Sequence, residues 1–400
     1  MNAALRQYIT ITASYWTFTV TDGALRMLVV LYFHSLGYSP LEVASLFLLY
    51  EFFGVITNLF GGWLAARTGL NTTLHLGLAL QIIALGMLLV DSSMLTVVYV
   101  MVAQALSGIA KDLNKMSAKS SIKMLVPDNA QSKLYQWVSR LTGSKNALKG
   151  FGFFLGALLL SGLGFQGAVA MMAAVLLVVF IASYLLLDSH MGKTTFKPKF
   201  TDIFSKSPAV NRLSAARFFL FGSRDVWFVV ALPVFLQSQL NWNYTEVGGL
   251  LATWIIGYGI VQTFAPVITG IQRGKTPDGK TAFEWALALC VLPALIAVVM
   301  QLSWNVSQSL VIGLLVFGAL FAVNSSIHSY LIVAYAKEDG VSLDVGFYYM
   351  ANAAGRLTGT ILSGLVYQAY GLEACLMIST GFIIITSIIS VRLPRHKSSI

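Results

Sequence analysis

The sequence predicts an all-α integral membrane protein with twelve transmembrane helices in two pseudo-symmetric six-helix bundles. The 400 residues are 57% hydrophobic and only 10% charged, with a mean hydropathy of +0.76, whereas soluble domains carry about 25% charged residues. Apolar stretches of roughly 20 residues, the length that crosses a bilayer, recur along the whole chain. One long polar stretch divides them into two equal sets.

The predicted helices follow one another closely. We place them near residues 12–36, 41–66, 74–92, 94–117, 141–162, 166–187, 212–237, 247–270, 283–302, 308–336, 342–367 and 372–392. They are rich in Gly and broken by few charges, unlike the alternating strands of membrane barrels. The first is too long for a cleaved signal peptide and carries two charged residues, so we expect it in the mature protein. Cys290 and Cys375 fall inside predicted helices and are expected to be free, buried thiols.

The longest polar stretch sets the domain organisation. We expect an N-terminal six-helix bundle over 1–187 and a cytoplasmic linker over 188–211. A C-terminal six-helix bundle with a short cytoplasmic tail follows over 212–400. The segment LGYSPLEVA (36–44) resembles LNWNYTEVG (240–248), which indicates that the two halves are repeats.

Charged residues take part in the same repeat. Asp22 in the first helix corresponds to Asp225 in the seventh, and the NALKG and NAAGR segments pair Lys149 with Arg356. All these correspondences are separated by about 205 residues. Parallel halves with a site between them near the midplane are an architecture of secondary transporters.

Positive charges in the loops predict the topology. If the N-terminus is cytoplasmic, the outer loops contain no Lys or Arg. The inner loops contain Arg67, Lys123, Lys133, Lys193, Lys197, Lys199, Lys206, Arg273, Lys275, Lys280 and Lys337. This positive-inside bias predicts that both termini are cytoplasmic. It also accounts for the net charge of +10 without nucleic-acid binding.

Further charges lie inside the predicted membrane helices, where a lone ion costs at least about 2.5 kcal/mol. The basic ones are Arg26, Lys111, Lys115, Lys145, Lys149, Arg217, Arg224 and Arg356. The acidic ones are Asp22, Glu51, Asp112 and Asp225. Eight cations against four carboxylates leave four positive charges to be neutralised. We therefore expect a cavity that binds a multiply charged anion.

Arg224 and Arg356 are the strongest candidates for contact with this anion, because both lie near the centres of their helices. A guanidinium binds phosphate-like and carboxylate oxygens in bidentate fashion. Gly355 and Gly359 flank Arg356 and allow a ligand or helix to approach closely. Asp225 directly follows Arg224, so the two are expected to point in different directions, with Asp225 paired to a basic residue on another helix.

Lysines recur every four residues in KDLNKMSAKSSIK, which begins at Lys111. Lys119 and Lys123 are expected to reach the inner membrane surface through their long side chains. Lys111 lies some 25 Å from the outer end of its helix at 1.5 Å per residue, a depth that suits a cavity. Lys149 enters from the inner side to a depth of about 12 Å by the same rise and is also a candidate, whereas Lys145 suits a structural role equally well.

Other intramembrane residues have two interpretations. Asp22 and Arg26 are four residues apart, which suits an intrahelical ion pair as well as a binding role. Glu51 is either a proton carrier or a hydrogen-bonded buried carboxyl. His328 is expected to be a satisfied core histidine, although it has the chemistry to bind an anion or a proton.

The chain resembles the major facilitator superfamily of transporters over its whole length. The superfamily's motif between helices two and three, Gly-x-Leu-Ala-Asp-Arg-x-Gly-Arg-Arg, is similar to GWLAARTGLN (62–71). The motif aspartate is Ala66 here, and the position of a helix-four arginine in proton-coupled members is taken by Gln104. These departures affect the usual inter-helix charge lock and drug/proton exchange, and leave the fold unaffected.

Four longer stretches resemble the organoarsenical efflux permeases of the ArsJ type. They are TDGALRMLVV (21–30), ALSGIAKDLNKMSAKSSIK (105–123), LTGSKNALKG (141–150) and SAARFFLFGSRDVWFVVALP (214–233). The resemblance implies a bacterial inner-membrane exporter of 1-arseno-3-phosphoglycerate that confers arsenate resistance. A companion glyceraldehyde-3-phosphate dehydrogenase would supply the substrate.

We therefore expect a transporter, not an enzyme, that works by alternating access around a cationic central site. The expected substrate-binding residues are Arg26, Lys111, Lys149, Arg224, Arg356 and Lys145, and the expected charge-pairing or proton-coupling residues are Asp22, Glu51 and Asp225. No phosphate-binding loop, metal-ligand cluster or nucleophile triad is present in the sequence, so we expect no cofactor or metal. A monomer is expected. An exchanger or exporter of other organic anions is the alternative, and a membrane sensor would be expected to carry a soluble output domain.

Overall fold

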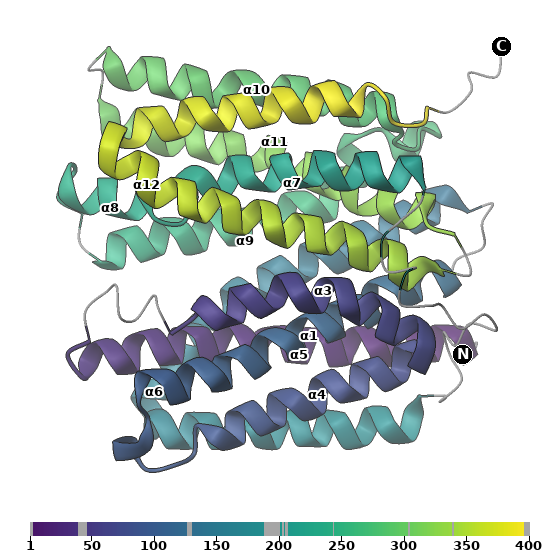
Figure 1. Ribbon diagram of the computed structural model, residues 1–400, viewed down its shortest axis with the longest axis vertical. Helices are drawn as coiled ribbons and strands as arrows, with labels where there is room; N and C mark the ends of the chain where they lie inside the picture. The colour runs from purple at the N-terminus through teal and green to yellow at the C-terminus, as the bar shows by residue number, and fades with distance from the viewer. Residues whose placement is uncertain are drawn as a thin grey trace. The chain divides into compact units, whose positions relative to one another are not determined.

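The computed structural model describes residues 3–38, 46–125, 130–187, 201, 204, 207–242, 244–302, 305–337 and 340–395. All secondary structure within these ranges is helical, as the sequence predicts (Figure 1). Most of the expected linker over 188–211 lies outside the described residues.

Long α-helices make up nearly all of the described chain. They are α1 (Ala3–Ser35), α3 (Leu48–Thr68), α4 (Leu70–Met87), α5 (Val97–Leu125), α6 (Gln131–Leu186), α7 (Pro208–Phe228), α8 (Ala231–Ser238), α9 (Tyr244–Ile268), α10 (Gly279–Gln301), α11 (Val306–Tyr335) and α12 (Val341–Ser390). Two short 3-10 helices, Ser92–Met94 and Ile271–Arg273, lie in the connections.

Eight helical segments of the described chain are long and apolar enough to cross a membrane, with α7 and α8 forming one of them. Two of the eight, α6 and α12, contain 56 and 50 residues and are each divided by a glycine with non-helical backbone angles. These glycines are Gly164 (φ 67°, ψ −179°) and Gly371 (φ 78°, ψ −174°), in a region that L-residues rarely adopt. With α6 and α12 counted twice, and the more polar α1 and α5 added, the described helices provide the twelve expected crossings.

Large apolar side chains on the outer surface fit a lipid environment. Phe154, Leu185 and Ile312 are 71%, 76% and 62% exposed. In water such residues would be unfavourable in this number, but in a bilayer they face hydrocarbon, and the helices satisfy their own backbone hydrogen bonds. The protein is therefore a multi-pass membrane protein.

Several helix boundaries differ from the prediction: α1 begins at Ala3, α5 continues to Leu125, and α7 begins at Pro208, within the expected linker. Two further differences have a clear physical reason. α6 begins at Gln131, ten residues before the expected start, because a hydropathy window ends at the polar segment QSKLYQWVSR while the helix continues. The seventh span is broken between α7 and α8. Pro233 has no N–H to donate to the preceding turn, and Ser363 Oγ on α12 accepts hydrogen bonds from the N–H groups of Val230 (3.4 Å) and Ala231 (3.0 Å) at the break.

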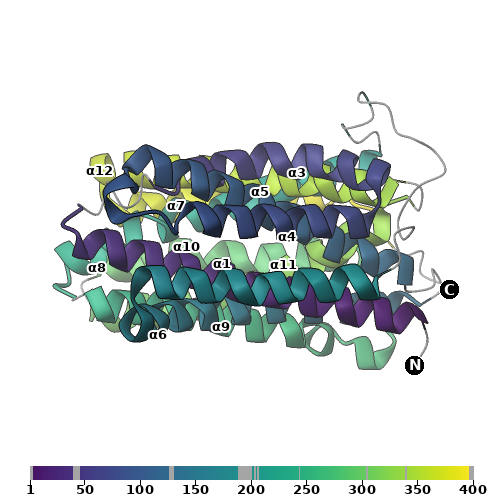
Figure 2. The ribbon, with the colours of Figure 1, turned by 90° about the horizontal axis from the view of Figure 1, so that it is seen from below.

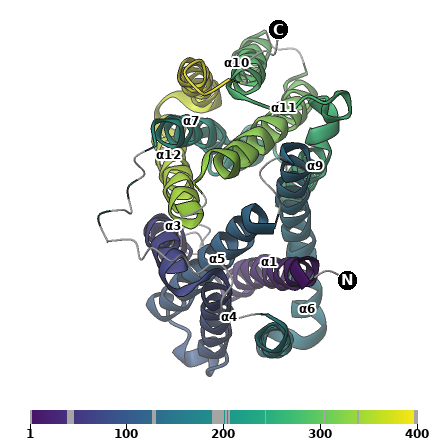
Figure 3. The same ribbon diagram turned by 90° about the vertical axis from the view of Figure 1, so that its right-hand side faces the viewer.

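The chain forms two compact units. The first comprises Met1–Asn129, Ser144–Phe204 and Ala336–Met350. Within it α5 packs against α1, α3 and α4 (Figures 2 and 3). The approach of α5 to α3 is close, since a Cβ on Gly108 would lie 2.6 Å from the carbonyl oxygen of Tyr50. This packing brings the charged residues of α1, α3 and α5 together.

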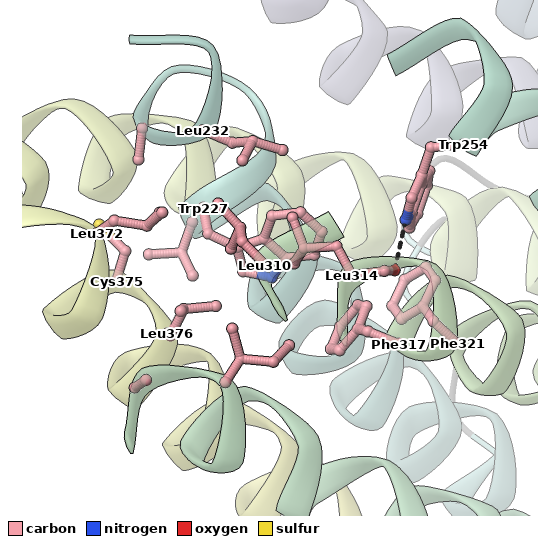
Figure 4. Close-up of a cluster of buried hydrophobic side chains, with 14 of the residues drawn as sticks. Trp227, Leu232, Trp254, Leu310, Leu314, Phe317, Phe321, Leu372, Cys375 and Leu376 are labelled. Atoms are coloured by element: carbon pink, nitrogen blue, oxygen red, sulfur yellow. Dashed lines mark hydrogen bonds between the residues drawn. The ribbon is translucent and has the colours of Figure 1, made fainter. Parts of the chain in front are cut away.

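The second unit comprises Ala130–Gly143, Ser205–Tyr335 and Ala351–Ile400. In it α11 packs against α7, α9 and α10. Trp227, Trp254, Phe317 and Phe321 belong to its apolar core (Figure 4). The indole N–H of Trp254 donates to the carbonyl oxygen of Leu314 at 2.8 Å, whereas the buried indole N–H of Trp227 in the same core has no hydrogen-bond partner among the described residues.

Small residues allow the first and fifth helices of each half to cross closely. In the first unit, a Cβ on Gly152 of α6 would lie 2.4 Å from the carbonyl oxygen of Val20 in α1. In the second unit, a Cβ on Gly355 of α12 would lie 2.1 Å from the carbonyl oxygen of Phe218 in α7. Each crossing lies beside a pair of charged side chains, which form the candidate site.

Candidate substrate-binding site

One buried carboxylate is shared by two arginines in the second unit. Asp225 on α7 is fully buried. Its Oδ2 accepts a hydrogen bond from Arg356 Nε on α12 at 3.0 Å, and its Oδ1 accepts from Arg224. The expected pairing of Asp225 with a basic residue on another helix is correct. The expectation that Arg224 and Asp225 point apart is wrong, because the long arginine side chain folds back to its neighbour.

Aromatic rings surround the Arg224 guanidinium. Its Cζ lies 5.1 Å from the ring centroid of Phe221, 5.7 Å from that of Phe228 and 5.6 Å from that of Phe321. The Arg224 side chain is only 13% exposed beside these rings, so its charge is less screened than that of a surface arginine. The Cζ of the buried Arg217 lies 3.8 Å from the Phe221 ring as well, so this ring contacts two guanidinium groups.

Arg217 is held by neutral oxygens. Its Nε donates to Asn352 Oδ1 at 2.8 Å, and its Nη1 donates to the carbonyl and hydroxyl oxygens of Ser325 at 3.2 Å. These three acceptors are uncharged. The Arg217, Arg224, Asp225 and Arg356 side chains together contain three positive charges and one negative charge.

The first unit holds a second group of charges, arranged around Tyr50 of α3. The Tyr50 hydroxyl donates to Asp22 Oδ1 at 2.7 Å, and Lys149 Nζ lies 3.9 Å from Asp22 Oδ2. Arg26 Nη2 donates to Glu51 Oε1 at 3.1 Å. The intrahelical pair of Asp22 with Arg26 is thus replaced by an inter-helix pair, because α3 supplies a separate partner to each of these residues.

The Tyr50 ring also lies against two cations. Lys111 Nζ is 3.9 Å from the ring centroid, and Arg26 Cζ is 4.7 Å from it. Lys111 Nζ further lies 3.8 Å from Asp112, which accepts a hydrogen bond from Lys115 at 2.6 Å. Sequence reasoning missed Tyr50, because nothing in the pattern separates it from the other fifteen tyrosines. It also left Asp112 and Lys115 without a role.

The structure therefore brings most of the candidate residues together in two clusters. The first-unit cluster consists of Asp22, Arg26, Tyr50, Glu51, Lys111, Asp112, Lys115 and Lys149. The second-unit cluster consists of Arg217, Arg224, Asp225, Arg356 and Phe221. Lys145 donates to the adjacent Asn146 Oδ1 at 3.2 Å.

Three other expectations are corrected. Lys119 does not reach the surface, since it is only 3% exposed, and the side chain of Lys123 lies outside the described residues. His328 is buried, but neither of its ring nitrogens has a hydrogen-bond partner among the described residues. Cys375 is buried and Cys290 only partly so, and both are free thiols.

The clusters suit anion binding. Guanidinium and ammonium groups are donors that recognise phosphate-like and carboxylate oxygens. In both clusters the carboxylates already contact cations, so an incoming anion would compete with them for the same donors. Among the described residues no group of three His, Cys, Asp or Glu side chains could hold a metal ion.

The described helices provide twelve membrane crossings, and each compact unit contains one cluster of partly or fully buried charged side chains, a combination expected of a membrane transporter. The chain belongs to the Major Facilitator Superfamily, which it matches over residues 11–275 and 213–399. It is therefore a transporter and not an enzyme. No curated protein matches the sequence.

Solved structures share the fold at low sequence identity. The human organic anion transporter MFSD10 superposes with a TM-score of 0.77 at 15% identity, over 98% of this chain and 100% of that chain. The E. coli fucose:proton symporter FucP has a TM-score of 0.76 at 11% identity, over 98% and 100%. A bacterial homologue of the iron transporter ferroportin, in an outward-facing state, has a TM-score of 0.73 at 13% identity, over 98% and 99%.

Proposed function

We propose that this protein exports 1-arseno-3-phosphoglycerate across the bacterial inner membrane by alternating access and so confers arsenate resistance. Both termini lie in the cytoplasm in this proposal, as the loop charges indicate. A glyceraldehyde-3-phosphate dehydrogenase that uses arsenate supplies the substrate. Outside the cell the exported compound falls apart and releases arsenate.

The observation that carries the proposal is the sharing of the buried Asp225 by Arg224 and Arg356. The two guanidinium groups converge on a single carboxylate, and charge inside a membrane protein is costly. A substrate with arsenate, phosphate and carboxylate groups would offer these donors further oxyanion partners. Arg26, Lys111 and Lys149 of the first-unit cluster are further donors for the same substrate.

The carboxylates have a role in the empty protein. Asp22, Glu51 and Asp225 hold the cations in place through the ion pairs described above. When substrate oxygens replace these carboxylates, the cations change partners, which links substrate binding to the packing of α1 with α3 in the first unit and of α7 with α12 in the second. Glu51 remains a candidate proton carrier, since its side chain is 34% exposed.

An exchanger or exporter of organophosphates or other organic anions is the second candidate. The cationic clusters suit any molecule with several acidic groups equally well. The particular substrate is suggested by the resemblance of the four long stretches to organoarsenical permeases. A test must therefore distinguish transport of the arsenylated compound from transport of organophosphates and other organic anions.

The test uses arsenate-sensitive bacteria that lack other arsenic-resistance genes. This protein is expressed with and without the partner dehydrogenase, and growth in arsenate and arsenic retained by the cells are measured. Resistance and low retained arsenic only with both proteins are the expected result. If an expressed pair gives no resistance, the arsenic substrate is rejected and uptake into inverted vesicles is measured with phosphorylated three-carbon acids.

A further inference from the structure

A row of three lysines follows one face of α5. Lys111, Lys115 and Lys119 are four residues apart, so successive ammonium-bearing side chains begin about 6 Å apart along the helix axis. All three are largely buried: the Lys111 and Lys115 side chains are 19% and 14% exposed, and Lys119 is 3% exposed. One carboxylate, Asp112, contacts both Lys111 and Lys115. The proposed function uses only the first lysine of this row.

Two tyrosine rings cover the row. Tyr50 of α3 lies over Lys111, as described above. Tyr349 of α12, within the same compact unit, has its ring centroid 4.5 Å from Lys115 Nζ and 5.8 Å from Lys119 Nζ. A single ring therefore faces two buried ammonium groups.

An aromatic ring is a replaceable partner for an ammonium group. The attraction between a cation and a ring is weaker than that between an ammonium and an oxyanion, which adds short charge-assisted hydrogen bonds. A lysine ammonium has three rotatable donors and readily adapts to a tetrahedral oxyanion. Two ammonium groups one helical turn apart provide enough donors for the several oxygens of one such group.

We propose that Lys115 and Lys119 form a second anion subsite, which takes a phosphate-class oxyanion of the substrate in place of the Tyr349 ring. The subsite rests on the proposed function, because it shares Lys115 with the first-unit cluster, where Asp112 contacts both Lys111 and Lys115. Lys119 lies between that cluster and the end of α5 at Leu125, the end that the loop charges assign to the cytoplasm. An exported anion coming from that side meets Lys119 before it meets Lys111.

The proposal is tested by binding to the purified full-length protein in detergent. Isothermal titration with 3-phosphoglycerate, and separately with inorganic phosphate, gives the Kd of wild type and variants. Lys119→Gln should raise Kd about tenfold, the effect of losing about 1.4 kcal/mol of binding, and Lys119→Arg should restore it to within about threefold. The matched control is Lys280→Gln, a 64% exposed lysine that pairs with Glu284 in α10.

Substitutions of Tyr349 distinguish a binding role of Lys115 and Lys119 from a purely structural role. Tyr349→Leu removes the ring that competes with the anion, so it should lower Kd for phosphate about threefold. Tyr349→Phe keeps the ring and should leave Kd unchanged. An unchanged or raised Kd in Tyr349→Leu, with the variant folded by its melting curve, would overturn the competition between ring and anion.

The same titrations separate this subsite from the proposed function. If Arg356→Gln abolishes binding of 3-phosphoglycerate while Lys119→Gln leaves it unchanged, the subsite is wrong and the anion transporter stands. If wild type binds neither probe at millimolar concentration, the subsite is rejected and the cationic clusters lose their assigned ligand as well.

Discussion

Asp225 and Arg356 form an ion pair between α7 and α12, and Asp22 and Lys149 form its counterpart between α1 and α6. In both units an acid on the first helix of a half meets a cation on the fifth. The distances differ, at 3.0 Å for the arginine and 3.9 Å for the lysine. The second unit therefore holds its carboxylate more tightly, and Arg224 adds a second donor there.

The first prediction concerns the two arginines that share Asp225. Arg224→Gln and Arg356→Gln should each abolish transport, because each removes one of the guanidinium donors for the substrate. The protein should still reach the membrane in normal amount. Transport into inverted vesicles and membrane content by immunoblot are the measurements, with Lys280→Gln as control. Normal transport by both variants would exclude the cationic site.

The second prediction concerns the carboxylate itself. Asp225→Asn leaves two guanidinium groups side by side without their buried counter-charge, so the protein should lose about 3 kcal/mol of stability. Millimolar phosphate should recover part of this loss by taking the place of the carboxylate. Thermal unfolding in detergent, with and without phosphate, measures both effects. The control Glu284→Gln, at a 56% exposed side chain, should show neither.

The third prediction is that the ion pair between Arg26 and Glu51 is weaker than the buried ion pairs. Both side chains are partly exposed, at 26% and 34%, so solvent screens their attraction. A double-mutant cycle with Arg26→Gln and Glu51→Gln should give a coupling free energy below about 1 kcal/mol. A coupling above about 2 kcal/mol would show that this pair is as strongly desolvated as Asp225.

The fourth prediction tests the close helix crossing beside Arg356. Gly355→Ala should destabilise the protein and reduce transport, because its Cβ would lie 2.1 Å from the carbonyl oxygen of Phe218. Gly257→Ala is the matched control, since nothing lies within 4 Å of the added Cβ in α9. There the better helix propensity of alanine, about 1 kcal/mol, should leave stability unchanged or raised. Equal effects of the two substitutions on the melting temperature would contradict the packing argument.

Much of the fold could be predicted from the sequence, because a membrane-spanning helix is recognised by a stretch of roughly 20 mostly apolar residues. The twelve crossings are predicted from the recurrence of apolar stretches, which includes the more polar α1 and α5, and the internal repeat relates Lys149 to Arg356 from the sequence. The bundle boundaries near 188–211 stay a prediction.

The pairing of charges could be predicted only in part. The sequence predicts that Asp225 pairs with a basic residue on another helix, and the structure shows that this residue is Arg356. By contrast, Arg26 had a suitable acid on its own helix at Asp22 and a second one on α3, and spacing cannot choose between them. The choice depends on Tyr50, whose hydroxyl donates a hydrogen bond to Asp22.

The burial of Lys119 could not be predicted from the sequence either. A lysine near the end of a membrane helix usually reaches the surface, and the sequence contains no signal that α12 supplies Tyr349 to cover the adjacent lysines. Contacts between segments more than two hundred residues apart are set by tertiary packing. The local pattern of the lysine row therefore indicates the face of the helix but not its burial.

The reversals at Gly164 and Gly371 also bear on how the chain enters the membrane during synthesis. Each joins two helices through a single residue, and the segments around them, GLGFQG and AYGLE, contain no lysine or arginine. We expect helices joined so tightly to insert as one hairpin, and a tip without lysine or arginine to cross the hydrocarbon with a smaller barrier, since Glu373 is the one charged residue in these two segments. A lysine at Leu163, which is 48% exposed in the finished protein, would therefore disturb biogenesis far more than it disturbs the folded state.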